Sequence, residues 1–256
     1  MNDFVDPSFS DFSIVGIDEV GYGCWAGPIY VCALKLNCVS QTKFVDSKSI
    51  SHKKRLEMSE IIKDIATWNI GIGLVEEINQ FGLAYAYNKA ILRALDPFTD
   101  QSSAADSLAD RAIDPLADQG SIAQLVDPQV CSFQRQVSLT NDEQHDLDLL
   151  NVQNCTSFIN HRLIIDGRKP KWMDELGLNC TAIIKGDQKV QAISAASIVA
   201  KVERDAFMDR LDVEFPVYGF NRNKGYGTTL HVAAIREHGF CQYHRTSYNL
   251  GKYLLK

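Results

Sequence analysis

Four acidic residues stand where predicted strands end or tight turns begin. One adjacent pair follows an apolar run, a third acid precedes a glycine and a fourth follows a Lys-Gly pair; they are Asp18, Glu19, Asp166 and Asp187. The ends of neighbouring strands in an α/β sheet meet at one edge, where side chains distant in sequence converge. Carboxylates without cysteine or histidine suit Mg²⁺ or Mn²⁺, which also bind phosphate oxygens. The pattern predicts a divalent-metal site for phosphodiester chemistry.

Two such ions about 3.5–4 Å apart activate a water and stabilise the leaving oxygen in an in-line displacement at phosphorus. This chemistry needs no covalent nucleophile. Spacing alone leaves a second interpretation open, in which each acid is a helix cap or a solvated strand end. Because consecutive strand residues point to opposite faces, Asp18 and Glu19 share a site only if the strand turns at Glu19. The glycines at 21 and 23 favour such a turn.

The elements that must position these acids alternate in the α/β manner. Runs rich in Val and Ile predict strands, apolar residues at helical spacing predict helices, and the small residues after Val190 let a helix approach a sheet closely. We predict strands at 13–18, 28–36, 68–75, 163–166 and 182–184, and helices at 53–66, 79–95, 190–215 and 229–238. The first two strands should form an antiparallel hairpin, and the last two should be parallel. The expected fold is one α/β domain with a mixed sheet covered by helices.

The net charge of −6 is unevenly distributed. Between Asp96 and Phe158, eleven acids stand against two bases, which leaves +3 for the rest of the chain. A net negative charge confined to one segment is compatible with a nucleic-acid partner elsewhere. The segment has no lysine and contains a near-repeat, Asp106–Asp110 and Asp114–Asp118. We therefore predict that 96–158 is an acidic insertion, mobile or loosely helical.

Several classes of protein are excluded by the remaining composition. Seven scattered cysteines without a C-x-x-C pair indicate neither a disulfide framework nor a zinc site, and we expect them to be reduced and mostly buried. No apolar run approaches the roughly 18 residues that span a bilayer, and the acidic amino terminus does not resemble a signal peptide. A cytoplasmic protein without a membrane partner is expected. The six histidines show no ligand spacing with the acids, so none is assigned a catalytic role.

The segment Gly16–Pro28, which reads Gly-Ile-Asp-Glu-Val-Gly-Tyr-Gly-Cys-Trp-Ala-Gly-Pro, resembles the opening signature of the ribonuclease HII family. Six further segments resemble that family's motifs in the same order. They are Asp46–Ser51 (D-S-K-K-L-S), Ile165–Gly167 (I-D-G), Lys185–Asp187 (K-G-D), Ala192–Asp205 (the long helix signature), Lys224–Thr228 (K-G-Y-G-T) and His244–Tyr248 (H-R-x-S-F). Only the 96–158 segment lies outside this resemblance.

The resemblance implies a ribonuclease H-like fold with a carboxyl-terminal helical extension, in which 1–95 and 159–256 form one nuclease domain. It implies an endonuclease that acts as a monomer on RNA/DNA hybrids or on DNA with embedded ribonucleotides, leaving 5′-phosphate and 3′-hydroxyl ends. The four acids match the family's metal-binding catalytic residues, which hold two Mn²⁺ or Mg²⁺ ions.

The resemblance also implies substrate contacts. The backbone of Gly21, Tyr22 and Gly23 matches the turn that reads the ribonucleotide 2′-hydroxyl, the group that separates RNA from DNA. Tyr226 matches a tyrosine that stacks on the neighbouring sugar. Two pairs of residues stay open between phosphate contact and structural support. These pairs are Lys48 with Lys201, and Arg245 with Ser247.

One residue departs from the family pattern, because the family usually carries Arg where this chain has Tyr22. The change removes a positive charge and a bidentate phosphate donor. Three alternatives therefore stay open: the ribonuclease HIII preference for longer hybrids, a catalytically silent nucleic-acid-binding relative, and an enzyme whose acidic segment is a protein-interaction arm. The Lys185–Asp187 motif and the carboxyl-terminal matches favour ribonuclease HII, and the four retained acids favour catalysis.

Overall fold

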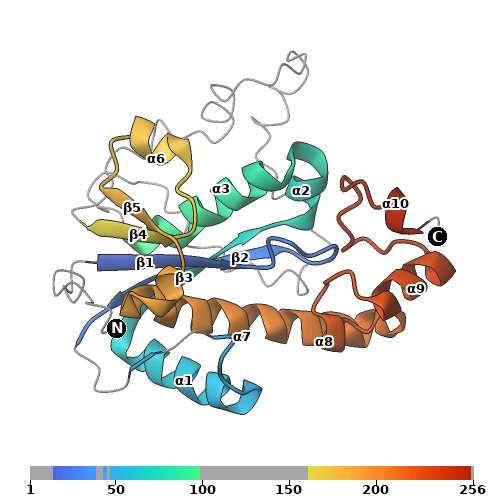
Figure 1. Ribbon diagram of the computed structural model, residues 1–256, viewed down its shortest axis with the longest axis horizontal. Helices are drawn as coiled ribbons and strands as arrows, with labels where there is room; N and C mark the ends of the chain where they lie inside the picture. The colour runs from blue at the N-terminus through green and yellow to red at the C-terminus, as the bar shows by residue number, and fades with distance from the viewer. Residues whose placement is uncertain (1–13, 39–42, 45–46, 99–160, 255–256) are drawn as a thin grey trace.

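A computed structural model of the chain describes residues 14–38, 43–44, 47–98 and 161–254 (Figure 1). Its strands are β1 (Ile14–Val20), β2 (Ile29–Leu36), β3 (Ala66–Gly73), β4 (Arg162–Asp166) and β5 (Cys180–Ile183). Its α-helices are α1 (His52–Ile65), α2 (Val75–Phe81), α3 (Leu83–Leu95), α6 (Lys171–Glu175), α7 (Gln191–Glu214), α8 (Phe220–Asn223), α9 (Thr229–His238) and α10 (Gly251–Leu254). Short 3₁₀ helices are η2 (Asp96–Phe98), η7 (Gly186–Gln188) and η8 (Pro216–Tyr218).

The five strands form one mixed sheet in the order β3-β2-β1-β4-β5. β1 and β2 pair as the predicted antiparallel hairpin, and β3 continues the antiparallel part. β4 runs parallel to both β1 and β5, as predicted for the two short apolar strands. The parallel order places the carboxyl ends of β1, β4 and β5 at one edge of the sheet.

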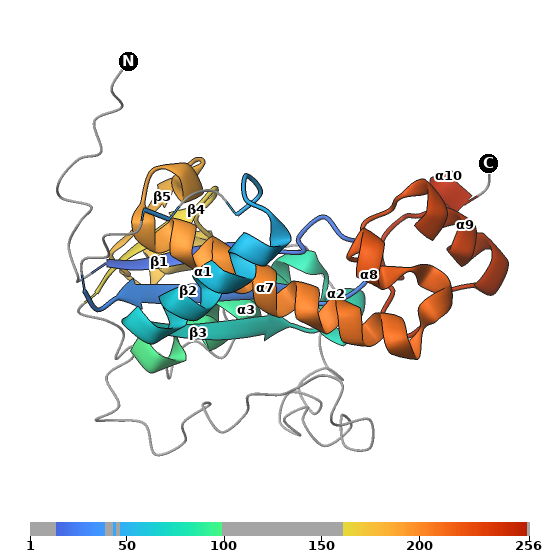
Figure 2. The same ribbon diagram turned by 90° about the horizontal axis from the view of Figure 1, so that it is seen from below.

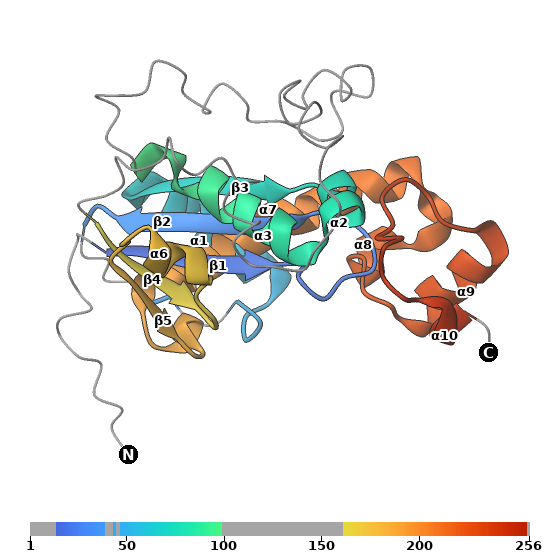
Figure 3. The same cartoon turned by 90° about the horizontal axis from the view of Figure 1, so that it is seen from above.

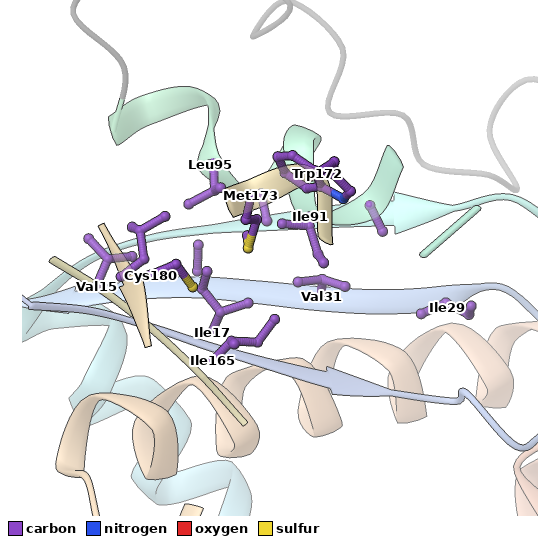
Figure 4. Packing of buried hydrophobic residues seen from close by; sticks show 14 of the residues in the cluster. Val15, Ile17, Ile29, Val31, Ile91, Leu95, Ile165, Trp172, Met173 and Cys180 are labelled. Atoms are coloured by element: carbon purple, nitrogen blue, oxygen red, sulfur yellow. The ribbon is translucent and has the colours of Figure 1, made fainter. Parts of the chain in front are cut away.

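Helices cover both faces of this sheet. α1 and α7 lie across one face (Figure 2), and α3 and α6 lie across the other (Figure 3). Alternation along β1 follows this division, because Val15 and Ile17 pack with α3 and α6 whereas Ile14 packs beside the start of α7. Figure 4 shows the first of these cores, with Ile91 of α3 and Met173 of α6 above the sheet.

The small residues at the start of α7 allow a very close approach to β1. A Cβ atom on Gly16 would stand 2.4 Å from the backbone carbon of Ala192. Only glycine fits there, and the contact sets where α7 begins relative to the strand that carries Asp18.

The carboxyl-terminal extension shares a core with the sheet domain. Residues from the second half of α7, η8, α8 and α9 pack with Tyr30 of β2 and Val75 of α2. The mixed sheet covered by helices and the carboxyl-terminal helical extension agree with the architecture that the sequence predicts (Figure 1). None of the helices in the described ranges has the length and apolar character needed to cross a membrane.

Several predicted bounds are wrong. The single helix predicted over 79–95 is two helices, because Gly82 at φ 91° ends α2 and starts α3. The strand predicted at 182–184 begins earlier, at Cys180, and stops before the exposed Ile184. β3 lies two residues before its predicted position because Val75 already belongs to α2. The predictions for α9 and the body of α7 are confirmed, whereas α6 and α8 were not predicted.

The prediction of a mobile acidic insertion lies outside the described residues from position 99 to 160. Its first residues, Asp96–Phe98, form η2, and Phe98 is buried in the core beside α3. The described cysteines are all free, as expected, and Cys24, Cys32 and Cys180 are buried.

Candidate active site

The predicted acids lie at the edge where β1, β4 and β5 end. Asp166 is the last residue of β4, and Asp187 lies in η7, immediately after β5. The parallel pairing of β1 with β4 stops at Ile17 opposite Ile165, so Asp18 and Asp166 follow side by side. Asp18 and Asp187 are each only 6% exposed. Burial to this degree is unusual for aspartate side chains, which are mostly exposed in folded proteins.

The expected turn at Glu19 does not occur. β1 continues to Val20, and Glu19 stays paired opposite Val31 in the antiparallel ladder. Asp18 therefore projects toward α7, where it has a hydrogen bond with Ser197, while Glu19 projects to the α3 face with Val15 and Ile17. Because β4 ends at Asp166, beside this part of β1, the carboxylates of Asp18 and Glu19 both lie close enough to Asp166 to interact with its charge.

Hydrogen bonds hold the carboxylates of Asp18 and Asp166 in place. The Glu19 N–H donates to Asp18 Oδ1 at 2.8 Å, and Ser197 is hydrogen-bonded to Ser47 at 2.9 Å between the two hydroxyl oxygens. The Gly186 N–H donates to Asp166 Oδ1 at 2.6 Å, which joins the η7 loop to the end of β4. Of these groups, only the Glu19 N–H is next in sequence to the acid that it contacts, whereas Gly186 and Ser197 come from other parts of the chain.

Electrostatic repulsion within this cluster is large. Burial, with the neighbouring Glu19 and Asp166 carboxylates, raises the pKa of Asp18. Burial and Asp166 raise the pKa of Glu19 to about 7, although Lys48 opposes the shift. Asp187 adds to the same field at Glu19. The four acids therefore act on one another as a group, and a nearby cation stabilises their ionised forms.

The two lysines predicted to contact phosphate have different surroundings. Lys48 lies close enough to Glu19 to lower its pKa, on a loop held by Arg55, which donates to the Ser47 carbonyl at 2.9 Å and the Ile50 carbonyl at 3.1 Å. Lys201 pairs with Asp205 one turn later, with 2.6 Å between Nζ and Oδ1. Arg55 had no sequence signal beyond its place on an amphipathic helix.

Two fully buried arginines hold the glycine-rich loop that follows β1. Arg245 donates to the carbonyls of Gly21 (2.7 Å), Tyr22 (2.9 Å) and Gly27 (2.9 Å from Nε). Arg204 donates to the carbonyls of Pro28 at 3.0 Å and Ala26 at 3.2 Å. Between its two predicted roles, Arg245 thus has the structural one. Ser247 is similar, because its hydroxyl donates to the Ile78 carbonyl at 3.1 Å.

This loop directs its carbonyl groups inward. Among the hydrogen bonds of the described residues, none uses the backbone N–H of Gly21, Tyr22 or Gly23. Gly21 has φ 92°, and a Cβ there would stand 2.2 Å from Arg204 Nε, so only glycine allows the loop to close over the arginine. Three backbone donors are therefore left for a ligand beside Glu19.

A second loop brings Tyr226 to the first. The N–H groups of Trp25 and Ala26 donate to the Gly225 carbonyl at 2.8 and 3.2 Å. Gly225 has φ 85°, and a Cβ there would stand 2.2 Å from the Ala26 carbonyl oxygen. The Tyr226 ring is 45% exposed. The structure thus joins two motifs about two hundred residues apart in the chain.

Below Tyr226, two buried histidines form a chain of hydrogen bonds. His231 Nδ1 lies 2.9 Å from the Tyr226 carbonyl oxygen, and the Nε2 atoms of His231 and His244 are 3.1 Å apart. The Cys241 N–H donates to His244 Nδ1 at 2.9 Å. Burial and His231 lower the pKa of His244 to about 4, so both rings are neutral near pH 7. Their role is to support the loop, away from the acids.

Tyr87 of α3 was missed by the sequence analysis. Its ring meets the Tyr22 ring edge to face, with centroids 5.5 Å apart and planes at 88°. Burial and the charges of Glu19, Asp18 and Asp166 raise the pKa of Tyr87, which places it beside the acid cluster. A tyrosine within an amphipathic helix gives no sign that it faces a site rather than the core.

Comparison with known proteins identifies the family. The family model described as Ribonuclease HII matches residues 15–101 and 129–250. The chain belongs to the ribonuclease HII family. A curated Ribonuclease HII from Ehrlichia chaffeensis is 31% identical over 239 residues, which cover 92% of this chain and 85% of the relative. Members of this family are endoribonucleases.

Solved structures of ribonucleases H share the fold at low sequence identity. The ribonuclease HII in a PCNA:RNase HII complex from Archaeoglobus fulgidus superposes with a TM-score of 0.53 at 18% identity, covering 93% of this chain and 95% of that chain. A Bst-RNase HIII in complex with Mn²⁺ superposes with a TM-score of 0.51 at 14% identity, covering 100% of this chain and 75% of that chain. At these identities the likeness concerns the fold alone.

The ribonuclease HII family implies a divalent metal, and the acid cluster can be tested for its fit. Throughout the described ranges, no three Asp, Glu, His or Cys side chains are already placed as ligands around one point. The four side chains nevertheless fit a hard cation, because all their ligand atoms are carboxylate oxygens. Burial also makes the ionised forms of Asp18 and Glu19 unfavourable when no cation is present. A cation at the strand ends would relieve this repulsion.

Proposed function

We propose that this chain hydrolyses the RNA strand of RNA/DNA hybrids and cuts at ribonucleotides embedded in duplex DNA, leaving 5′-phosphate and 3′-hydroxyl ends. The observation that carries the proposal is the pairing of a buried carboxylate cluster with three unused backbone N–H groups on the adjacent loop. The first feature suits phosphodiester hydrolysis, and the second suits recognition of a hydroxyl group.

The catalytic residues of this proposal are Asp18, Glu19, Asp166 and Asp187, which hold Mg²⁺ or Mn²⁺. Two such ions would activate the attacking water and stabilise the leaving oxygen. The Gly186 N–H and Ser197 keep Asp166 and Asp18 in place for this purpose. Mn²⁺ in the Bst-RNase HIII structure supports the choice of ion, without deciding between the two metals.

Substrate selection depends on the glycine-rich loop after β1 and the loop that carries Tyr226, which are hydrogen-bonded to each other. N–H groups of the Gly21–Gly23 turn donate to the ribose 2′-hydroxyl, whose oxygen accepts at most two of them and is exposed in the wide minor groove of an A-form duplex. Tyr226 packs on the neighbouring sugar, and Lys48 contacts a phosphate near Glu19. Lys201 supports its own helix through Asp205, so its phosphate contact is the weaker part of the proposal.

A second candidate is a preference for long hybrids of the ribonuclease HIII kind. Tyr22 favours it, because the loop lacks the arginine that the ribonuclease HII family usually carries. A catalytically weak relative that only binds nucleic acid is disfavoured by the four acids at one edge. A protein partner for residues 96–158, a monomeric state and a cytoplasmic location stay predictions from the sequence; PCNA is the partner in the Archaeoglobus fulgidus complex.

The test offers three duplexes with Mg²⁺ or Mn²⁺: DNA with one ribonucleotide, a full RNA/DNA hybrid and DNA alone. We expect cleavage of the first two, with ends that carry a 5′-phosphate. Asp166→Asn should remove cleavage without unfolding the protein. Asp174→Asn is the matched control, because Asp174 is an exposed acid on α6 paired with Lys169. Unchanged cleavage by Asp166→Asn would refute the site assignment.

A further inference from the structure

Tyr22 is held beside the carboxylate cluster by two hydrogen bonds to its backbone carbonyl and one contact of its ring. Its backbone carbonyl accepts hydrogen bonds from Arg245 Nη1 at 2.9 Å and from the Tyr248 hydroxyl at 3.5 Å. Its ring rests edge to face against Tyr87, yet it stays 44% exposed. An anchored, half-exposed ring at the tip of a binding loop offers a preorganised apolar surface, since little side-chain freedom is lost when a ligand packs on it.

Tyr87 comes from a different element. It lies on α3, which covers the sheet face to which Glu19 projects (Figure 3). Edge-to-face geometry is a preferred arrangement of two aromatic rings, so Tyr87 fixes the orientation of the Tyr22 ring. Tyr87 is partly buried against the core behind α3, whereas Tyr85 on the same helix is buried within that core and packs on Phe81 with centroids 4.7 Å apart.

We propose that Tyr22, braced by Tyr87, is an uncharged packing contact for the sugar face of a nucleotide in the minor groove. Tyr87 acts as the positioning residue. The inference rests on the proposed function, because the free N–H groups on either side of the Tyr22 ring place the ribose within one nucleotide of it. The bases of a duplex stay stacked, so a ring at this place meets a sugar rather than a base.

The contact differs in kind from the phosphate contact of an arginine. A neutral ring releases no counterions on binding, so its loss should weaken affinity equally at all salt concentrations. Tyr226 presents a second exposed ring from the loop that is hydrogen-bonded to this one. Together the two tyrosines give the site two sugar contacts and little charge.

The test measures the Kd for DNA with one ribonucleotide at several salt concentrations, with all variants in an Asp166→Asn background that prevents cleavage. Tyr22→Ala should weaken binding roughly tenfold, the effect of losing one aromatic contact, with an unchanged salt slope. Tyr22→Phe should bind like the parent. Tyr22→Arg should bind more tightly and steepen the slope by about one phosphate contact.

A double-mutant cycle tests the bracing. Tyr87→Leu should weaken binding in the parent but add nothing to Tyr22→Ala, and Tyr87→Phe should be neutral because it keeps the ring. Tyr85→Leu is the matched control on the same helix, and a thermal melt of each variant excludes unfolding as the cause. A Tyr87→Leu effect that persists in the Tyr22→Ala background would overturn the bracing.

Binding by Tyr22→Ala that equals the parent would overturn the packing contact itself. If the wild-type protein cleaves ribonucleotide-containing duplexes while this variant binds normally, the inference alone fails. If the wild-type protein cleaves no ribonucleotide substrate, the proposed function and the inference fail together.

Discussion

Burial of Glu19 beside Asp166 makes this carboxyl group costly to ionise in the folded chain. Its pKa of about 7 compares with 4.5 for an ordinary glutamate. Between these values the folded protein holds a proton that the unfolded chain has released, so the free energy of unfolding falls as pH rises from 4.5 to 7 and then levels. The cluster thus lowers stability at the pH at which it would bind a cation.

Glu19→Gln should therefore stabilise the metal-free protein above pH 7 while removing cleavage. The gain in unfolding free energy is at most about 3.5 kcal/mol, at about 1.4 kcal/mol for each pKa unit, and it should vanish near pH 4.5. Denaturant unfolding with a chelator at pH 5 and pH 8 measures it. Glu57→Gln, at an exposed glutamate of α1 paired with Lys54, should change neither property. A variant less stable than wild type at pH 8 would contradict the electrostatic argument.

The acids were predictable from sequence because each stands beside a turn-forming glycine, but their surroundings were not. Arginine is normally exposed, so nothing in sequence indicates that Arg204 and Arg245 are fully buried. Whether Tyr87 faces a core or a site depends on which helix covers which sheet face. The turn expected at Glu19 is absent because pairing with β2 continues to Val20, a long-range interaction that local residue types do not encode.

At the scale of elements, hydrogen bonds from the carboxyl-terminal segment hold the glycine-rich loop in place. Arg245→Met removes donors to the carbonyls of Gly21, Tyr22 and Gly27. Gly21 and Tyr22 each keep a longer hydrogen bond, from the Cys24 N–H at 3.3 Å and the Tyr248 hydroxyl at 3.5 Å, whereas the Gly27 carbonyl loses both of its bonds to Arg245. A buried acceptor without a partner costs about 1–3 kcal/mol, so we expect the unfolding free energy to fall by roughly that amount and KM to rise in the protein that stays folded. Denaturant unfolding and steady-state kinetics measure both.

The matched control for Arg245→Met is Arg236→Met. Arg236 is exposed on α9, where it donates to the Tyr253 carbonyl at 2.7 Å. Its replacement should change the unfolding free energy by about 0.5 kcal/mol or less. Equal decreases in unfolding free energy for the two variants would mean that Arg245 contributes no more to stability than a surface arginine does.

Element types were more predictable than element ends. The periodicity of α7 and α9 is long enough to show a helix, whereas α6 has only five residues and no repeat to detect. The break between α2 and α3 depends on Gly82, which has a positive φ. From the sequence alone, a glycine at this place is compatible with either a helix break or a tolerated glycine within a helix. Strand order and the pairing of the two glycine-rich loops required the three-dimensional structure.

At the scale of the whole molecule, the two described residues that flank positions 99–160 lie close together. The rings of Phe98 and His161 lie edge to face with centroids 6.2 Å apart. A glycine–serine linker of about six residues spans such a gap. The entropy of closing a loop varies only with the logarithm of its length, so replacing 99–160 by this linker should raise the unfolding free energy by only about 2 kcal/mol.

Two deletions separate the chemistry from any role of this segment. The family match omits only 102–128 from this region and resumes at 129, so the prediction of an insertion is strongest there. Deleting 102–128 should leave kcat/KM on both ribonucleotide substrates unchanged. Replacing 99–160 by the linker should do the same if the segment adds nothing to the site at the ends of β1, β4 and β5. Loss of cleavage only in the larger deletion, with a normal thermal melt, would assign a catalytic or substrate-binding contribution to 99–101 or 129–160 and would restrict the insertion to the shorter range.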